Sequence, residues 1–418
     1  MQDETRRDLP SLADRDWLSA AATQKVLAAL AAAGHEGRVV GGAVRNALLG
    51  VPVVDVDIAT AAAPERVIAV MREAGLAAIP TGIEHGTITV VCDGRPFEVT
   101  TLRRDVETDG RRAVVAYTDD WAEDARRRDF TLNALYCDAA GRVHDPLGGY
   151  PDLAARRVRF IGDAGARIRE DYLRSLRFFR VHATYGAGPL DGDGLLAVAR
   201  NRDGLARLSA ERVRAELMRV LVAPGAIAAI DAMQTHGILS FVLGAGPRPG
   251  LLAALASAEA RLGATPDAVL RLSVLALATD DDRARLSHRL RLSGAEQRDL
   301  LVLDRRWGDR MAVATEAGER RELYRLGAET WQRHALAAIA GGAEPGRFEA
   351  LYNLPAVWAP PRFPLSGKHV LALGLPPGKD VGILLAEAED WWVAEDFPPD
   401  DAVEAHLGRL AARRQSQS

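Results

Sequence analysis

VVDVDIAT, residues 53–60, places Asp55 and Asp57 two positions apart in an otherwise apolar run. The alternation predicts a β-strand on which both carboxylates point to one face, because successive side chains of a strand point to opposite faces. Two like charges on one face are costly to desolvate unless a cation lies between them. The pair is therefore either part of a half-exposed edge strand or part of a cation site.

The segments on either side of this strand favour the cation site. RVVGG (38–42) predicts a buried strand that ends in a turn, and the following residues predict a helix closed by Gly50. The start of such a helix favours phosphate, and glycine there permits close approach. Glu98, which alternates with Phe97 and Val99, would add a third carboxylate. Three carboxylates suit Mg²⁺, and two metals about 4 Å apart can activate a hydroxyl and stabilise a leaving pyrophosphate.

Size and composition are those of a globular protein with more than one domain. The chain has 418 residues, of which 48% are hydrophobic and 26% charged, and this length exceeds what a single core usually supports. No apolar stretch is long enough to predict a membrane span, and the charged N-terminus shows no signal peptide. Cys92 and Cys137 lie in apolar, strand-like settings and are expected to be reduced core residues. We therefore expect a cytoplasmic protein.

The pattern of apolar residues changes along the chain. Up to about residue 145 strand and helix signals are mixed, with strands expected at 87–94 and 96–103 around an Asp-Gly turn. Beyond that point the apolar spacing is helical nearly everywhere, and GAGPRPG (244–250) is the clearest linker signal. This pattern predicts an α+β head followed by a long all-helical body.

Five blocks follow one another along the chain: GGAVRNALLG with VDVDIAT, RRDFTLNAL (127–135), DPLGGYPDL (145–153), REDYLRSLRFFR (169–180) and LSAERVRAEL (208–217). Together they resemble the signature motifs of the class II tRNA nucleotidyltransferases, which include the CCA-adding enzymes and bacterial poly(A) polymerases of the polymerase-β superfamily. LSGKHVLALGLPPGKDVGILL (365–385) is a weaker match to the family's C-terminal region.

The resemblance implies an α+β architecture: a nucleotidyltransferase head with a small mixed sheet and helices, followed by an all-helical neck, body and tail. On this basis we predict an N-terminal extension at 1–20 and a catalytic head at 21–145. We place a helical neck with a nucleobase-selecting motif at 146–225, and a tRNA-binding body and tail at 226–418.

The resemblance also implies roles for single residues. Asp55 and Asp57 would hold the catalytic Mg²⁺ ions, with Glu98 as the third catalytic carboxylate. The nucleotide-binding residues that it implies are Gly41, Gly42, Arg45, Arg127, Arg128, Asp129, Asn133, Asp171, Arg174 and Arg177. Taken alone, RRDF would indicate only a surface helix start with Asp129 as its cap.

Asp171 and Arg174 have two interpretations. On a continuous helix both Glu170 and Asp171 would lie near Arg174, and the simplest result is an intrahelical salt bridge. Alternatively the pair is a protein template for the incoming base, because arginine offers only donors and an ionised aspartate only acceptors. Such a pair matches the amino group and ring acceptor of C or A and rejects the carbonyl of U or G. The resemblance implies this template role, and the two interpretations can hold in different states.

Two further features bear on the product. LRRDVETDGRRAVV (102–115) predicts a polar loop between two strands, and in CCA-adding members a flexible loop at this place is needed for the switch from C to A. Arg103 and Asp105 match the residues of that loop. Asn46 stands where the family's GGxVRD motif has Asp, so a hydrogen-bonding role could survive there and an ionic one could not. The scattered histidines His182, His236, His288, His334 and His369 form no His-Asp pair, so we expect no second phosphohydrolase activity.

We therefore expect template-independent addition of CCA to the 3′ end of tRNA from CTP and ATP, with Mg²⁺ as cofactor. A poly(A) polymerase and a CC-only or A-only enzyme are the alternatives within the family, and a non-catalytic RNA-binding protein is the alternative of another class. The net charge is −4, but residues 151–180 carry eight arginines against four acids, which favours a polyanion partner locally. The expected partners are tRNA, CTP and ATP, with no membrane and no protein partner.

Overall fold

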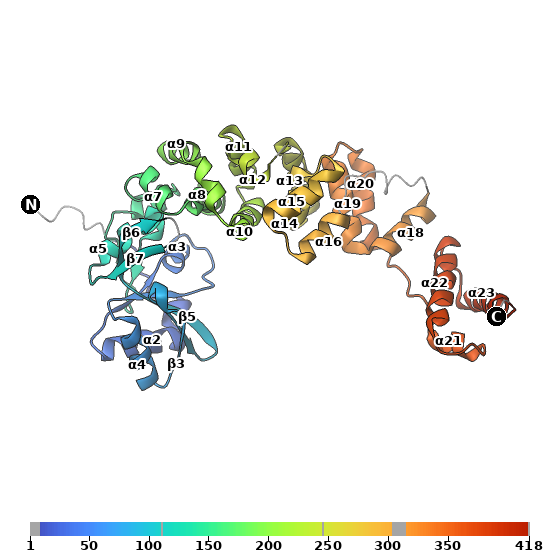
Figure 1. Ribbon diagram of the computed structural model, residues 1–418, viewed down its shortest axis with the longest axis horizontal. Coiled ribbons are helices and arrows are strands. Elements are labelled where there is room, and N and C mark those ends of the chain that lie inside the picture. The colour runs from blue at the N-terminus through green and yellow to red at the C-terminus, as the bar shows by residue number, and fades with distance from the viewer. Residues whose placement is uncertain (1–8, 110–111, 245, 303–314, 417–418) are drawn as a thin grey trace, which may run out of the picture. The chain divides into compact units, whose positions relative to one another are not determined.

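The structure is a computed structural model that describes residues 9–109, 112–244, 246–302 and 315–416 (Figure 1). The chain divides into two compact units, Met1–Gly244 and Ala245–Ser418. The division falls at the start of the GAGPRPG segment, as its linker composition predicts. Among the described residues, strands occur only in the N-terminal unit, which confirms the predicted α+β class.

A seven-stranded mixed sheet forms the core of the N-terminal unit, in the order β3-β4-β5-β2-β1-β8-β9. Strands β2 and β5 run parallel, and every other neighbouring pair in this sheet is antiparallel. The strands are β1 Gly37–Val40, β2 Asp57–Thr60, β3 Ala77–Gly82, β4 Thr87–Cys92, β5 Arg95–Thr101, β8 Tyr136–Cys137 and β9 Val143–His144. Strand β2 is central, and its first residue, Asp57, pairs with β5.

Helices α2 and α4 contact each other and the β3–β4 part of the sheet. Helix α4 follows from its sequence: Pro64 occupies the first turn, Val67, Val70 and Met71 are buried at helical spacing, and Gly75 ends it at φ +71°. The helical segments of this part are α1 Asp16–Ser19, α2 Ala21–Ala32, α3 Gly42–Leu48, α4 Pro64–Glu73, η1 Ile83–His85, α5 Trp121–Arg126 and η2 Thr131–Asn133.

The residues that precede α2 are packed onto this fold. Leu12 and Leu18 are each 1% exposed, and the Leu12 N–H donates to the Gly141 carbonyl at 2.8 Å. Gly141, at φ +84°, would place a Cβ 2.2 Å from the Ala13 nitrogen, so only glycine fits there. The segment from Leu12 to Leu18 therefore joins the start of the unit to a turn near residue 141.

Two predicted elements differ in the structure. The strand expected at 53–60 begins only at Asp57, because β5 pairs from Asp57 onward and β1 pairs from Ile58 onward. The expected loop at 102–115 instead forms β6 Arg103–Asp109 and β7 Arg112–Tyr117, which pair as a separate two-stranded sheet. Residues 110–111 of that segment lie outside the described residues.

The rest of the N-terminal unit is helical and centres on α8. Helix α8 contacts α7, α10 and α11, and its Phe178 is fully buried, with its ring stacked on Phe160 at 5.4 Å between centroids. The segments are α6 Tyr150–Ala154, α7 Ala164–Glu170, α8 Leu173–Tyr185, α9 Gly192–Arg200, η3 Arg202–Arg207, α10 Ala210–Leu221, α11 Ala226–Thr235 and α12 Ile238–Leu243.

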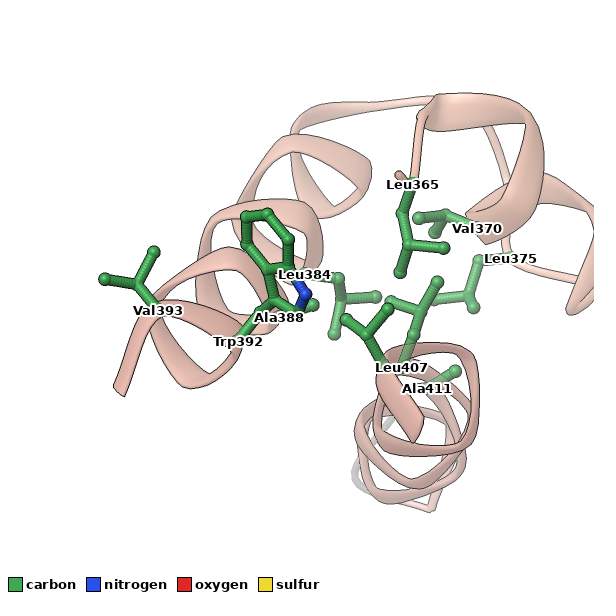
Figure 2. Packing of buried hydrophobic residues seen from close by; sticks show 10 residues of the cluster. Leu365, Val370, Leu375, Leu384, Ala388, Trp392, Val393, Leu407 and Ala411 are labelled. Carbon is green, nitrogen blue, oxygen red and sulfur yellow. The ribbon is translucent and has the colours of Figure 1, made fainter. Parts of the chain in front are cut away.

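The described part of the C-terminal unit consists of helices: α13 Pro249–Leu262, α14 Ala268–Ala276, α15 Asp280–Leu290, α16 Gly294–Val302, α18 Glu316–Leu326, α19 Ala328–Ala340, α20 Pro345–Val357, α21 Gly367–Ala372, α22 Lys379–Ala394 and α23 Asp400–Gln415. Figure 2 shows the apolar cluster that α21, α22 and α23 enclose, with Trp392 beside Leu384 and Ala388. Trp391 stacks on His406 at 4.1 Å between ring centroids. Both tryptophans therefore serve the packing of this region.

Two further observations concern the whole described chain. Cys92 and Cys137 are both buried and free, as their apolar settings predict. In the ranges that the structure describes, no helix is long and apolar enough to cross a membrane.

Candidate active site

Three predicted carboxylates come from two neighbouring strands and the segment before one of them. Asp57 opens β2 and is the register partner of Glu98 on the parallel strand β5. Glu98 is exposed between the buried Phe97 and Val99, so alternation along the strand turns it to the same face as Asp57. Asp55 is exposed and lies in the irregular segment 51–56. The expectation that Asp55 shares a strand face with Asp57 is therefore wrong, because no neighbouring strand pairs with residues 51–56.

The electrostatics of Asp57 reflect this arrangement. Its side chain reaches solvent, yet the protein around it removes enough water to raise the pKa of Asp57 to about 6. The negative charges of Glu98 and Asp55 act in the same direction, and the Arg128 guanidinium opposes them. A cation bound beside these carboxylates would remove the repulsion between them.

The residues present fit a divalent cation that is only partly held by protein. Across the described residues, no three His, Cys, Asp or Glu side chains gather closely enough to hold a metal by themselves. Carboxylate oxygens are nevertheless the ligands that Mg²⁺ prefers, and this ion keeps several waters and substrate phosphate oxygens in its coordination shell. One or two of the carboxylates, completed by such oxygens, meet that requirement.

The turn between β1 and α3 lies beside two other predicted residues. Gly41 has φ +71° and ψ −117°, a conformation that favours glycine. A Cβ at this position would lie 3.6 Å from Arg128 Nη1 and 3.7 Å from the Asn133 carbonyl oxygen. The Gly41 N–H donates to the Leu135 carbonyl at 3.1 Å. Gly41 therefore shapes the turn, and Gly42 begins the helix.

Arg45 is 8% exposed and contacts protein groups on three sides. Its Nη1 donates to Asn133 Oδ1 at 2.6 Å, and its Nε and Nη2 donate to Asn46 Oδ1 at 3.1 and 2.9 Å. Its guanidinium lies over the Tyr185 ring, 3.8 Å from the centroid. Burial lowers the pKa of Arg45, and Tyr185 partly offsets that shift.

Arg127 and Arg128 are both held by one buried acid, Asp124. Asp124 on α5 is 1% exposed and accepts from Arg127 Nε at 2.8 Å, Arg128 Nη2 at 3.0 Å and the Tyr136 hydroxyl at 2.8 Å. Burial alone would raise the pKa of Asp124, but Arg128 and Arg127 lower it below its usual value. An acid three and four residues before an arginine pair on a helix is the signal that could have found it.

Asp124→Ala is expected to lower the free energy of unfolding by about 3–5 kcal/mol, because it leaves Arg127, Arg128 and Tyr136 without their common acceptor. Urea denaturation followed by circular dichroism measures this change. The matched control is Asp203→Ala, which removes a 91% exposed acid 3.9 Å from Arg202 and should change stability by less than about 0.5 kcal/mol. Equal effects of the two substitutions would show that Asp124 is not a structural anchor.

A buried chain of polar contacts links α3 to α8. Asp129 Oδ2 accepts from Arg177 Nε at 2.8 Å and from Arg177 Nη2 at 2.5 Å, and its Oδ1 accepts from Asn133 Nδ2 at 3.0 Å. Asn133 Oδ1 in turn accepts from Arg45. Burial alone would raise the pKa of Asp129, but Arg177 and Asn133 lower it below its usual value. Four predicted nucleotide-binding residues are thus parts of one network.

The continuous helix expected through Asp171 and Arg174 is interrupted. Asp171 ends α7 in an extended conformation, φ −150° and ψ 104°, and α8 begins at Leu173. The intervening Tyr172 packs directly on Gly204, where a Cβ would lie 1.9 Å from its ring. This long-range contact is not visible in the local helix pattern.

The interruption separates the partners of the two residues. Arg174 pairs with Glu170 at 2.5 Å and donates to the carbonyls of Arg127 and Arg167. Asp171 accepts from the Leu173 N–H at 3.1 Å and from Arg212 Nη2 at 2.7 Å. The salt bridge expected from helix spacing is therefore present for Glu170, and Arg212 is a partner of Asp171 that the spacing did not indicate.

The remaining predicted residues belong to the hairpin. Arg103 donates from Nη1 to the His85 carbonyl, and its backbone N–H donates to Asp124 Oδ1 at 3.4 Å. The backbone of Asp105 pairs with Val115, and the Asp105 side chain lies outside the described residues.

Two cavities open on the N-terminal unit. The larger, about 1130 Å³, is lined by residues of the 159–165 segment, α7 and α9, and by none of the predicted site residues. The smaller, about 440 Å³, is lined by the 53–56 segment with Asp55, by Trp17 and Thr23, and by the start of β5. Of these two cavities, the smaller touches a predicted catalytic residue, Asp55.

Comparison with known proteins agrees with the sequence motifs. Residues 37–159 match the family described as "Poly A polymerase head domain", and residues 190–255 match "Probable RNA and SrmB- binding site of polymerase A". The mouse (Mus musculus) mitochondrial CCA tRNA nucleotidyltransferase 1 is 36% identical over 368 residues, which cover 86% of this chain and 83% of the mouse protein. The CCA-adding enzyme of Lactobacillus johnsonii is 31% identical, with 87% and 90% covered.

A solved structure extends the similarity to the fold. The crystal structure of the Bacillus stearothermophilus CCA-adding enzyme in complex with CTP has a TM-score of 0.71 and 28% sequence identity. It covers 95% of this chain, and the match spans 98% of that chain.

Proposed function

The chain belongs to the family of CCA-adding tRNA nucleotidyltransferases and bacterial poly(A) polymerases, and we propose that it completes the 3′ end of tRNA with CCA. It is a nucleotidyltransferase that takes CMP and AMP from CTP and ATP, releases pyrophosphate and uses no nucleic-acid template. Its partners are tRNA and these two nucleotides. The observation that carries the proposal is the parallel register of Asp57 and Glu98 in a chain 36% identical to a CCA tRNA nucleotidyltransferase.

The family uses a divalent metal, and we propose that in this chain it is Mg²⁺ held by Asp55 and Asp57, with Glu98 completing the carboxylate group. When bound, such an ion favours deprotonation of the tRNA terminal hydroxyl and offsets the charge of the leaving pyrophosphate. The raised pKa of Asp57 supports this assignment, because burial and the charges of Glu98 and Asp55 make its ionised form costly even with Arg128 nearby, and a bound cation would relieve that cost.

The chain's own residues would bind and orient the nucleotide. The Gly41–Gly42 turn allows close approach of a triphosphate, and Arg128 lies beside that turn. The Asp124 carboxylate holds Arg127 and Arg128, so their cationic groups are placed before substrate arrives. The buried network of Arg45, Asn133, Asp129 and Arg177 would keep the adjoining wall rigid.

For base selection we propose that Asp171 supplies acceptors and Arg174 supplies donors, so that C and A are accepted and U and G rejected. In the structure these groups bind Arg212 and Glu170 instead. The incoming base would therefore replace Arg212 as the partner of Asp171 and Glu170 as the partner of Arg174. Both groups remain partly accessible, with side-chain exposures of 30% for Asp171 and 15% for Arg174.

A poly(A) polymerase shares most of these residues. The β6–β7 hairpin supports CCA addition, because it occupies the place of the loop that CCA-adding members need for the switch from C to A. We also propose a reducing compartment, the cytoplasm, on the support of the two free buried cysteines.

The test is extension of a tRNA transcript that ends at its discriminator base, with each NTP supplied singly and then CTP together with ATP, in the presence of Mg²⁺. We expect two additions with CTP alone and three with CTP and ATP, after which growth stops. A long tail from ATP alone would establish a poly(A) polymerase. Absence of any incorporation would support the RNA-binding protein without catalysis.

A further inference from the structure

The irregular segment 51–56, which carries Asp55, contacts Asn46 before it enters β2. Two hydrogen bonds join the segment to Asn46, which lies in the last turn of α3. The Val51 N–H donates to the Asn46 carbonyl at 2.8 Å, and Asn46 Nδ2 donates to the Pro52 carbonyl at 3.0 Å. Asn46 therefore contacts the segment through both its backbone and its side chain.

The other side of the segment offers little support. Val54 is 86% exposed, and residues 53–56 line the cavity of about 440 Å³ together with Trp17 and Thr23. A segment that faces a cavity on one side and solvent on the other lacks the close packing that normally fixes a backbone. The hydrogen bonds of Asn46 therefore contribute more to the position of segment 51–56 than they would contribute in a closely packed region.

The chemistry of Asn46 requires an amide. Its Oδ1 accepts from Arg45 Nε and Nη2, and because arginine has only donors, the oxygen must face Arg45. The Nδ2 group is then left to face the Pro52 carbonyl, which can only accept. An aspartate at this position would keep the contact with Arg45 but would place an acceptor against an acceptor at Pro52.

We propose that Asn46 is a positioning residue that fixes the Asp55 segment relative to Arg45 and the turn at Gly41. The inference rests on the proposed function and deepens it, because the segment it positions carries a proposed metal ligand. It also explains why an uncharged residue serves here: only the amide joins Arg45 and the Pro52 carbonyl at once.

The test uses the full chain, without nucleotide or tRNA, and measures Mn²⁺ binding by electron paramagnetic resonance. Asn46→Asp is expected to weaken Mn²⁺ binding about fivefold. This is the change in affinity that the loss of one hydrogen bond between neutral groups typically causes. Asn46→Ala, which also loses the Arg45 contact, should weaken it at least as much. A simple charge effect has the opposite sign, because an added carboxylate would tighten Mn²⁺ binding. Equal or tighter binding by Asn46→Asp would overturn the proposal.

A second measurement follows the segment directly. Hydrogen–deuterium exchange of peptides covering residues 51–56 is expected to accelerate in both variants, while circular dichroism and the melting temperature stay close to wild type. The matched control is Asn353→Ala, whose Nδ2 donates to the Glu349 carbonyl at 2.9 Å far along the chain on α20. Unchanged exchange in the Asn46 variants would also overturn the proposal.

The proposed function can fail separately. Asp55→Asn should abolish Mn²⁺ binding if the carboxylates hold the metal. Retained Mn²⁺ binding in Asp55→Asn would refute the metal assignment, whereas loss in Asp55→Asn with wild-type binding in Asn46→Asp would refute only the role of Asn46.

Discussion

Asp57→Asn is expected to lower the rate of CMP incorporation into tRNA about 10³-fold or more, since metal-assisted charge stabilisation contributes several kcal/mol to the transition state. The substitution keeps the shape of the side chain and removes the charge that faces Glu98 across β2 and β5. Single-turnover incorporation measures the chemical step, and a gel-shift assay should show that tRNA binding is unchanged.

The control for this experiment is Glu65→Gln, which neutralises an exposed carboxylate in the first turn of α4. It should leave the incorporation rate within about twofold of wild type, because a single exposed charge away from the site is screened by solvent. A rate for Asp57→Asn within tenfold of wild type would show that Asp57 is not a metal ligand in the reaction.

Asp171→Ala is expected to lower CMP and AMP incorporation about 10–100-fold and to raise the share of UMP and GMP among the products. A hydrogen bond to a charged group contributes about 1.5–3 kcal/mol, and its loss removes the acceptor that distinguishes an amino group from a carbonyl. Primer extension with each NTP in turn, compared as kcat/KM, measures both effects.

Two further variants make this result specific. Arg174→Ala should also lower selectivity, because it removes the donors of the same template. Asp203→Ala, an exposed acid of the same unit, should leave selectivity as it is. If Asp171→Ala selects among the four nucleotides as wild type does, Asp171 has no role in base selection and serves only as the salt-bridge partner of Arg212.

Local sequence patterns predicted those parts of the site that depend on neighbouring residues. The alternation of Glu98 with Phe97 and Val99 predicts a strand that turns the carboxylate away from these apolar residues, and β5 has this pattern. Asp55 was misplaced because the extent of a strand depends on its neighbours, and β1 turns into α3 before it can pair with residues 51–56. The alternation of polar and apolar residues within a strand does not predict at which residue a neighbouring strand begins to pair with it.

The other misses have the same origin in long-range contacts. The β6–β7 hairpin was taken for a loop because its composition is polar, yet its two strands pair with each other outside the main sheet. The break at Asp171 depends on the contact of Tyr172 with Gly204, more than thirty residues away. The role of Asp124 depends on burial, which its local sequence does not predict. Asp124 is 1% exposed, and its carboxylate accepts hydrogen bonds from two arginines and from Tyr136.

The contact between Leu12 and Gly141 also dictates an order of events during synthesis. The ribosome makes Leu12 long before Gly141, so the buried Leu12 lacks this contact until the turn near 141 has emerged. Strand β1 can pair with β2 early, but its other edge has no partner until β8, Tyr136–Cys137, is made. The first residues of the nascent head therefore cannot pack fully at once. The head can complete its fold only after its last strands have left the exit tunnel of the ribosome.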